Sequence, residues 1–243
     1  MCELCAAKAG ARRIARRNFL QFAGIAAGLA MAPRAFAKET KTPPKPENVL
    51  SPDAALDRLM KGNTRYIDGL TKRHDFKHER EVLSKGQNPF AAVLSCADSR
   101  IAAELCFDTA RGDVFVCRVA GNFANDDIVA SLEYAVAVLN TPLIVVLGHG
   151  ACGAVDATIK SIKDGTTLPG HLPSLVSALR PAVDAVKDKP GDLLANAIRS
   201  NVMLTVDRLK SAAPILKAAA DDKKIRVVGR VYELKTGRVE LLS

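Results

Sequence analysis

Two short segments of this 243-residue chain carry side chains that bind soft metal ions. Cys96 lies in the first segment, and His149 and Cys152, three positions apart, lie in the second. Two thiolates and one imidazole form a donor set that suits Zn²⁺. Three protein donors leave the fourth position of a tetrahedral ion open, which is the arrangement of a catalytic zinc rather than a structural one. The sequence therefore predicts one zinc ion per chain at these three residues.

The alternative interpretation is that both cysteines are small buried side chains and the histidine is a hydrogen-bonded core residue. Asp98 and Arg100 bear on this choice, because they follow Cys96 at positions two apart and can point to the same side of an extended loop. An acid and a base have a catalytic task beside a metal, whereas a core would have to supply them with partners. The sequence thus favours a catalytic site, and we interpret Cys106 and Cys117 as packing residues.

Glycines surround the second segment, at Gly148, Gly150 and Gly153. Glycine permits sharp turns and a close approach of the backbone to a ligand. We therefore expect a strand-to-helix turn in which these glycines make the turn and bring the backbone near the metal.

Short apolar runs precede both segments, as expected of buried strands. The runs cover residues 90–95, 114–119 and 143–147, and the first and third end next to the two metal-binding segments. Helical patterns cover residues 125–139, a segment after Gly153, and residues 192–210. This alternation predicts an α/β fold with a mainly parallel central sheet flanked by helices, in which sites form at the carboxyl ends of strands.

The sequence indicates which structural elements begin and end the expected catalytic domain. Ser51, Pro52 and Asp53 are typical of a helix start, with serine as the cap and proline in the first turn. Residues 225–233 and 238–242 are rich in β-forming side chains and are separated by a short turn, so we expect a C-terminal β-hairpin.

The first 37 residues have the pattern of an export signal. A charged segment with Arg16 and Arg17 precedes a mildly apolar stretch and the small-residue sequence Ala35-Phe36-Ala37. The paired arginines resemble a twin-arginine signal, which implies export, with a periplasmic location. An amphipathic N-terminal helix or an uncleaved anchor is the alternative. We divide the chain into a signal peptide (1–37), a linker rich in lysine, threonine and proline (38–49) and a catalytic domain (50–243).

The net charge of +9 suggests a nucleic-acid partner at first sight, but more than half of this excess lies in the first 37 residues. The remainder has no basic block with interleaved aromatic residues, and the chain contains no tryptophan. No apolar run reaches the length of a mature membrane span. We therefore expect neither a nucleic-acid partner nor a stable membrane anchor.

The two metal-binding segments resemble the signatures of the β-class carbonic anhydrases. The first signature, Cys-x-Asp-x-Arg, is matched by Val93-Leu94-Ser95-Cys96-Ala97-Asp98-Ser99-Arg100, and the second, His-x-x-Cys, by Gly148-His149-Gly150-Ala151-Cys152-Gly153-Ala154-Val155. The similarity extends from about residue 55 to residue 155. Two departures stand beside it: Ala103 occupies a position where the family often has proline, and Val119 one where asparagine often follows arginine.

The resemblance implies a role for each site residue. Cys96, His149 and Cys152 bind zinc, and Asp98 with Arg100 forms the catalytic dyad. Asp98 is also a possible fourth ligand in a closed state. Substrate contacts are implied for Gln87, Phe115 and Tyr134, in a pocket that this family shares across a dimer interface.

The function implied by the resemblance is reversible hydration of carbon dioxide to bicarbonate and a proton by zinc-bound hydroxide. The implied assembly is a homodimer or a higher oligomer built from dimers. Two alternatives remain open at this point. One is a related zinc hydrolase that acts on carbon disulfide or carbonyl sulfide, and the other is a zinc-binding protein without catalytic activity.

Overall fold

The computed structural model of the protein describes residues 49–242. The predicted signal peptide lies outside the described residues, as does the predicted linker except for Val49. Among the described residues, no helix is long and apolar enough to cross a membrane.

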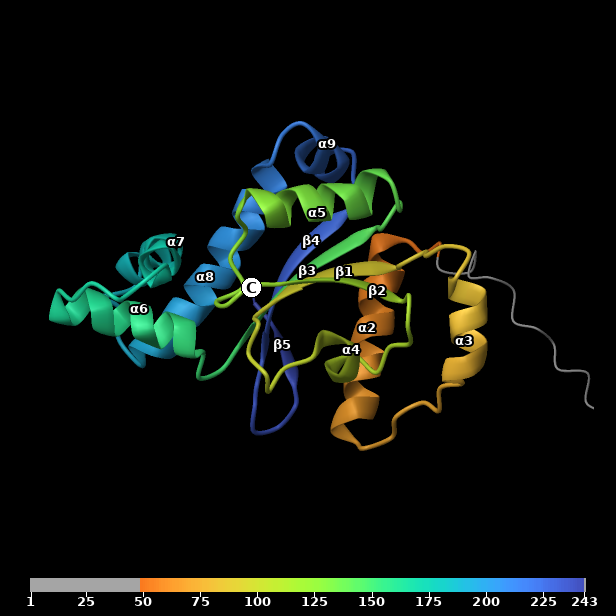
Figure 1. Cartoon of the computed structure of the whole chain (residues 1–243), viewed down its shortest axis with the longest axis horizontal. Coiled ribbons are helices and arrows are strands. Elements are labelled where there is room, and N and C mark those ends of the chain that lie inside the picture. Colours follow the sequence, from red (N-terminus) through yellow and green to blue (C-terminus); the bar gives the residue numbers. More distant parts are fainter. Residues whose placement is uncertain (1–48, 243) are drawn as a thin grey trace, which may run out of the picture. The chain divides into compact units, whose positions relative to one another are not determined.

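The centre of the fold is one five-stranded sheet with the strand order β2-β1-β3-β4-β5 (Figure 1). The strands are β1 (Ala91–Ser95), β2 (Val114–Arg118), β3 (Leu143–His149), β4 (Arg226–Tyr232) and β5 (Val239–Leu241). The first four are parallel to their neighbours, and β5 is antiparallel to β4. The predicted parallel sheet and C-terminal hairpin are both confirmed, but β3 continues to His149, two residues beyond its predicted end.

Helices cover both faces of the sheet (Figure 1). On one face, α5 (Asp126–Ala137) and α8 (Leu193–Ser211) pack on the strands, and α6 (Gly153–Asp164), α7 (Leu172–Asp184) and α9 (Ile215–Asp221) pack on these helices within the same apolar core. The other face packs against α2 (Pro52–Ile67) and α4 (Ala103–Cys106), whereas α3 (Phe76–Leu83) contributes no buried residue. Successive residues of β1 alternate between the two cores, as the pleat of a strand requires.

Side chains cap several of the helix starts, and the cap at Ser51 is the one expected above. The Ser51 hydroxyl accepts a hydrogen bond from the Ala54 backbone N–H, and the Asn125 side-chain oxygen accepts one from the Ile128 N–H. Helices α3, α7 and α9 were not expected. In α7 the sequence signal is obscured by Pro181, which lies inside the helix, three residues before its end.

Cys106 and Cys117 are buried, one in each core, which confirms their interpretation as packing residues. Burial raises the pKa of the Cys106 thiol to about 11 and also raises the pKa of the Cys117 thiol. Both side chains are therefore protonated and inert near neutral pH.

Candidate metal centre

The three predicted ligands converge because β1 and β3 are parallel neighbours. Ser95, the last residue of β1, pairs with Leu147, so Cys96 follows β1 at the level where β3 ends in His149. Cys152 is the N-cap residue of α6, directly after the turn that leaves β3. The side-chain donor atoms of Cys96, His149 and Cys152 all lie within 4.8 Å of one another, and all three residues are buried.

The separation of the two sulfurs fits a shared metal ion. The Sγ atoms of Cys96 and Cys152 are 4.0 Å apart. Two sulfurs that each bind a tetrahedral zinc at about 2.3 Å lie about 3.8 Å from one another. A disulfide needs a separation of about 2.05 Å, and both cysteines are free.

One ring nitrogen of His149 has no hydrogen-bond partner among residues 49–242. The residue is 0% exposed, and its Nδ1 lies 2.9 Å from the Gly150 carbonyl oxygen, to which Nδ1–H donates. That bond leaves the lone pair on Nε2, and Nε2 is a buried atom without a hydrogen-bond partner. A buried polar atom of this kind needs an occupant, and a backbone-held imidazole is the usual form of a zinc ligand. The donor set therefore fits zinc.

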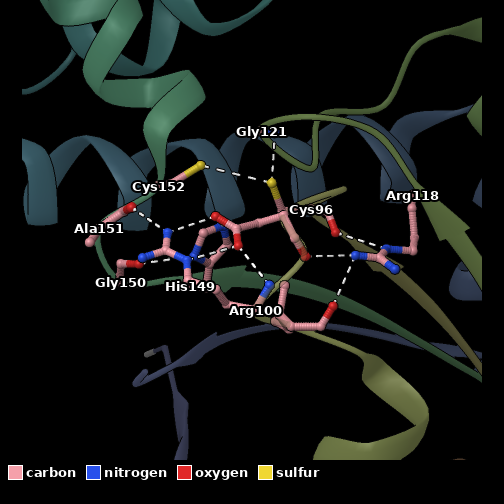
Figure 2. Close-up of polar contacts among 10 residues, drawn as sticks. Cys96, Arg100, Arg118, Gly121, His149, Gly150, Ala151 and Cys152 are labelled. Atoms are coloured by element: carbon pink, nitrogen blue, oxygen red, sulfur yellow. Dashed lines mark hydrogen bonds and ion pairs between the residues drawn. The ribbon is translucent and has the colours of Figure 1, made fainter. Parts of the chain in front are cut away.

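The sulfurs are held in an environment that favours negative charge on Cys96. The hydrogen bond from the Cys152 thiol lowers the pKa of Cys96 and, for the same reason, raises the pKa of Cys152. The Gly121 backbone N–H also donates to the Cys96 sulfur, at 3.2 Å (Figure 2). Cys152 lies at the positive end of the α6 dipole, which favours a thiolate once its proton has left.

Asp98 and Arg100 form a two-pronged ion pair beside this cluster. Arg100 Nε donates to Asp98 Oδ1 at 2.9 Å, and Nη2 donates to Oδ2 at 2.7 Å. Arg100 Nη2 also donates to the Ala151 carbonyl oxygen at 3.1 Å, which ties the first segment to the second (Figure 2). Asp98 Oδ2 lies 3.8 Å from Nε2 of His149. Arg100 holds the pKa of Asp98 well below its usual value, so the carboxylate is ionised throughout the neutral range.

The turn between His149 and Cys152 differs from its prediction. The left-handed residue is Ala151, with a φ of 51°, and not one of the neighbouring glycines. Gly148 has a packing role instead, because a Cβ atom there would lie 2.6 Å from Val202 Cγ2 of α8. This glycine therefore lets α8 approach the metal-binding turn closely.

Arg118 is a site residue that sequence reasoning missed. Its Nε donates to the Cys96 carbonyl oxygen at 3.0 Å, and its Nη2 donates to the carbonyl oxygens of Asp98 and Ile101 at 2.8 and 2.9 Å (Figure 2). One guanidinium thus holds the whole loop that carries the first ligand and the dyad. In the sequence, Arg118 is a basic residue at the end of a predicted strand, and nothing local indicates what it contacts.

Comparison with known proteins identifies the family. The carbonic anhydrase family model matches residues 91–239, more than half of the chain. A solved structure of the Coccomyxa β-carbonic anhydrase in complex with acetazolamide is 28% identical, with a TM-score of 0.60, over 77% of this chain and 86% of that one. The chain belongs to the β-class carbonic anhydrase family.

Curated relatives extend the similarity over almost their whole length. Carbonic anhydrase 2 of Mycobacterium tuberculosis (strain CDC 1551 / Oshkosh) is 37% identical over 192 residues, which cover 79% of this chain and 93% of that protein. A carbonic anhydrase of Mycolicibacterium smegmatis is 36% identical over 194 residues, with coverages of 79% and 94%.

The two departures from the β-carbonic anhydrase pattern are accommodated locally. Ala103 is the first residue of α4, a position where proline fits a helix but is not required. Val119 acts through its backbone: its N–H donates to the Ser95 carbonyl, and its own carbonyl accepts from the N–H of Ala97. Both side chains also pack against the apolar cores, and neither is one of the three metal donors.

The three residues that resemble β-carbonic anhydrase substrate contacts lie at the opposite end of the sheet from the cluster of their own chain. Phe115 pairs with Ala92, four residues before Cys96, and its ring lies 6.3 Å from the ring of Tyr134. Gln87 precedes β1, whereas Cys96 follows it. Since a five-residue strand spans about 16 Å, one chain does not bring these side chains to its own metal centre.

Proposed function

We propose that this chain catalyses the reversible hydration of carbon dioxide to bicarbonate and a proton, with zinc held by Cys96, His149 and Cys152. The observation that carries the proposal is the bare, buried Nε2 of His149 between two free thiols, with an ionised carboxylate 3.8 Å away. Zinc, when bound, supplies the Lewis acidity that makes hydroxide available near neutral pH. A non-catalytic zinc protein would have no use for a carboxylate fixed at this position.

Asp98 has the charge and the position to orient the nucleophile. An ionised carboxylate only accepts hydrogen bonds, so it can take one from the attacking oxygen and turn a lone pair of that oxygen toward the substrate. Arg100 keeps Asp98 ionised and directs both of its oxygens. Because Arg100 engages both oxygens, this geometry supports the state in which Asp98 stays paired and the fourth metal position stays open.

We further propose that the substrate pocket is completed by a second copy of the chain. The support is the register of the sheet, which places Gln87 and Phe115 far from the cluster of their own chain. Tyr134 is 47% exposed, although its ring packs beside that of Phe115. An aromatic pair with one exposed member that cannot reach its own metal can serve the metal of a partner, which makes a homodimer, or an assembly of dimers, the functional unit.

Export remains a proposal that rests on the sequence. Arg16, Arg17 and the small-residue sequence at 35–37 support a signal peptide and a periplasmic location. Free thiols that must bind zinc favour a route that exports the protein already folded, because an oxidising compartment promotes disulfides between exposed cysteines.

The test of the activity is a stopped-flow assay of carbon dioxide hydration, with metal analysis of the same sample. We expect one zinc per chain, loss of activity on removal of the metal by a chelator, and recovery when zinc is returned. Cys96→Ser should lose zinc and activity, whereas Cys117→Ser, at a buried cysteine outside the cluster, should keep both. A zinc-loaded protein that hydrolyses carbonyl sulfide or carbon disulfide but leaves carbon dioxide unchanged would contradict the proposal.

A further inference from the structure

The backbone of Gly121 connects the metal centre to the middle of α8 through its two flanking peptide groups. Its N–H donates to the Cys96 sulfur at 3.2 Å, and its carbonyl oxygen accepts a hydrogen bond from Asn201 Nδ2 at 2.7 Å. Both hydrogen bonds are buried, and Asn201 is only 4% exposed. Asn201 lies 80 residues away in the sequence and bonds to the backbone of Gly121.

Gly121 has a backbone geometry that few residues can adopt. Gly121 has a φ of +83°, and a Cβ atom there would lie 2.8 Å from Leu179 Cδ1. The next residue, Asn122, is also left-handed, with a φ of 42°. The peptide that joins these two residues is held at both ends: the Asn122 N–H donates to the Val119 carbonyl oxygen at 2.9 Å, and the Gly121 carbonyl oxygen accepts from Asn201. The Gly121 N–H belongs to the preceding peptide, so the Gly121 Cα joins the group that Asn201 holds to the group that contacts sulfur.

We propose that Asn201 is a positioning residue of the metal centre, which holds the Gly121 carbonyl and thereby the turn that directs the Gly121 N–H at the Cys96 sulfur. The inference rests on the zinc site proposed above. A hydrogen bond to a thiolate withdraws electron density from sulfur, so the sulfur donates less charge to a bound metal, and the metal becomes more electrophilic. The same bond restrains the Cys96 side chain before the metal arrives.

A merely structural role for Asn201 makes a different prediction, and Asn63 provides the matched control. Asn63 is 2% exposed, and its amide donates to the carbonyl oxygens of Cys106 and Gly237 at 2.9 and 2.8 Å. It lies on α2, which packs on the other face of the sheet from α8. Removing either amide leaves buried carbonyl groups without a donor, but only Asn201 is bonded to a residue whose backbone N–H contacts a metal ligand.

The experiment uses cobalt in place of zinc, because a thiolate-bound cobalt ion has a sulfur-to-metal charge-transfer band that reports electron density on sulfur. The full-length protein is loaded with Co²⁺ as wild type, Asn201→Leu and Asn63→Leu. Loss of the N–H···S hydrogen bond raises the energy of the sulfur electrons, so the band of Asn201→Leu should move to longer wavelength. The zinc dissociation constant of this variant, measured by competition with a chelator, should rise about tenfold, because lost restraint on the Cys96 side chain outweighs the stronger donation from its sulfur. Asn63→Leu should show the wild-type band and wild-type zinc affinity, although it unfolds at a lower temperature.

An unchanged band in a folded Asn201→Leu protein would overturn the inference and leave the zinc site intact. An equal shift in Asn63→Leu would also overturn it, because general loosening would then explain the effect. If Asn201→Leu does not fold, Asn201→Ala removes the same donor without adding a branched side chain, and the same shift is expected of it. A wild-type protein that binds neither metal would overturn the zinc site itself, and the inference with it.

Discussion

Arg100 engages both carboxylate oxygens of Asp98, through Nε to Oδ1 and through Nη2 to Oδ2, and its backbone N–H donates to Oδ1 as well. Arg100 is therefore the main residue that orients the Asp98 carboxylate and keeps it ionised. This pair lies outside the three metal donors, so its catalytic role can be separated from metal binding.

Asp98→Asn should keep one zinc per chain and lose roughly 10²-fold or more in turnover. The amide has no charge and replaces one accepting oxygen with a donor, so it cannot accept hydrogen bonds as the carboxylate does. Arg100→Ala should give a comparable loss, because Asp98 loses its orientation and its pKa rises toward the ordinary value. Metal content and stopped-flow turnover of the same preparations check both expectations.

Arg226→Ala is the control for the arginine variant, since it removes an arginine from an exposed ion pair with Asp53, near the start of α2. It should leave turnover unchanged. Wild-type turnover in Asp98→Asn would remove the carboxylate from the mechanism.

Replacing Arg118 should loosen the loop from Cys96 to Ile101. Arg118→Lys keeps the charge, but one ammonium group cannot reproduce the forked contacts with three carbonyl oxygens. We expect the zinc dissociation constant to rise about tenfold, as for other groups that orient a metal ligand, together with a fall in turnover. Arg199→Lys, in an exposed ion pair with Glu240, should alter neither quantity. If the zinc affinity of Arg118→Lys is unchanged, the loop from Cys96 to Ile101 keeps its shape without the three guanidinium hydrogen bonds.

The ion pair between Arg65 and Asp108 should make stability depend on pH. The Asp108 side chain is 2% exposed and accepts hydrogen bonds from Arg65 Nε and from the Lys72 backbone N–H. Burial by itself raises the pKa of Asp108, but these two donors outweigh it, so the net pKa is lowered. A lowered pKa stabilises the fold above the ordinary pKa of aspartate, and this contribution disappears as the pH falls through the lowered value.

Arg65→Met leaves the Asp108 carboxylate buried without its cation, so it should reduce the free energy of unfolding by about 3 kcal/mol at pH 7. In the variant the pKa of Asp108 rises, and protonation then relieves the unpaired charge. The deficit relative to wild type should therefore shrink as the pH is lowered to 4, which chemical denaturation at both pH values measures. Arg226→Met, in an exposed pair, should cost about 0–1 kcal/mol. A deficit of the same size at both pH values would show that lost packing, and not the charge, accounts for it.

The metal ligands could be predicted from the sequence because their signals are local. Cys96 follows one apolar run and His149 ends another, and parallel strands bring their carboxyl ends to the same edge. The helix caps at Ser51 and Asn125 were predictable for the same reason, since a cap bonds to a residue three positions away.

The groups around the ligands could not be predicted, because their contacts depend on tertiary structure. Arg118 reaches back across 17 to 22 residues to three backbone carbonyls. Asn201 reaches across 80 residues to a backbone carbonyl. Backbone acceptors are identical at every residue, so no side-chain pattern marks them. The left-handed turn at Ala151 was missed because alanine carries no preference for that conformation.

The pocket that we propose between two chains makes a prediction that no single variant can test, because it needs two different variants in one dimer. Cys96→Ser destroys the metal centre but leaves Phe115 intact, whereas Phe115→Ala keeps the metal centre and damages the aromatic pair. Each variant alone should have little activity. In a mixed dimer, the zinc of the Phe115→Ala chain faces the intact Phe115 of its partner, so one of the two sites is complete.

The two variants should be coexpressed with different affinity tags and the mixed dimer isolated by two purification steps. We expect about half of the wild-type activity per dimer, because one complete site in two remains in a symmetric pair. The control is a mixed dimer of Cys96→Ser with Asp98→Asn. Both changes lie at the metal end, so the only metal-loaded site carries the damaged dyad, and activity should stay near background. The opposite outcome is a mixed dimer of Cys96→Ser with Phe115→Ala that is no more active than the mean of the two variant homodimers. That result would show that each chain completes its own site, and the proposed arrangement across two chains would be wrong.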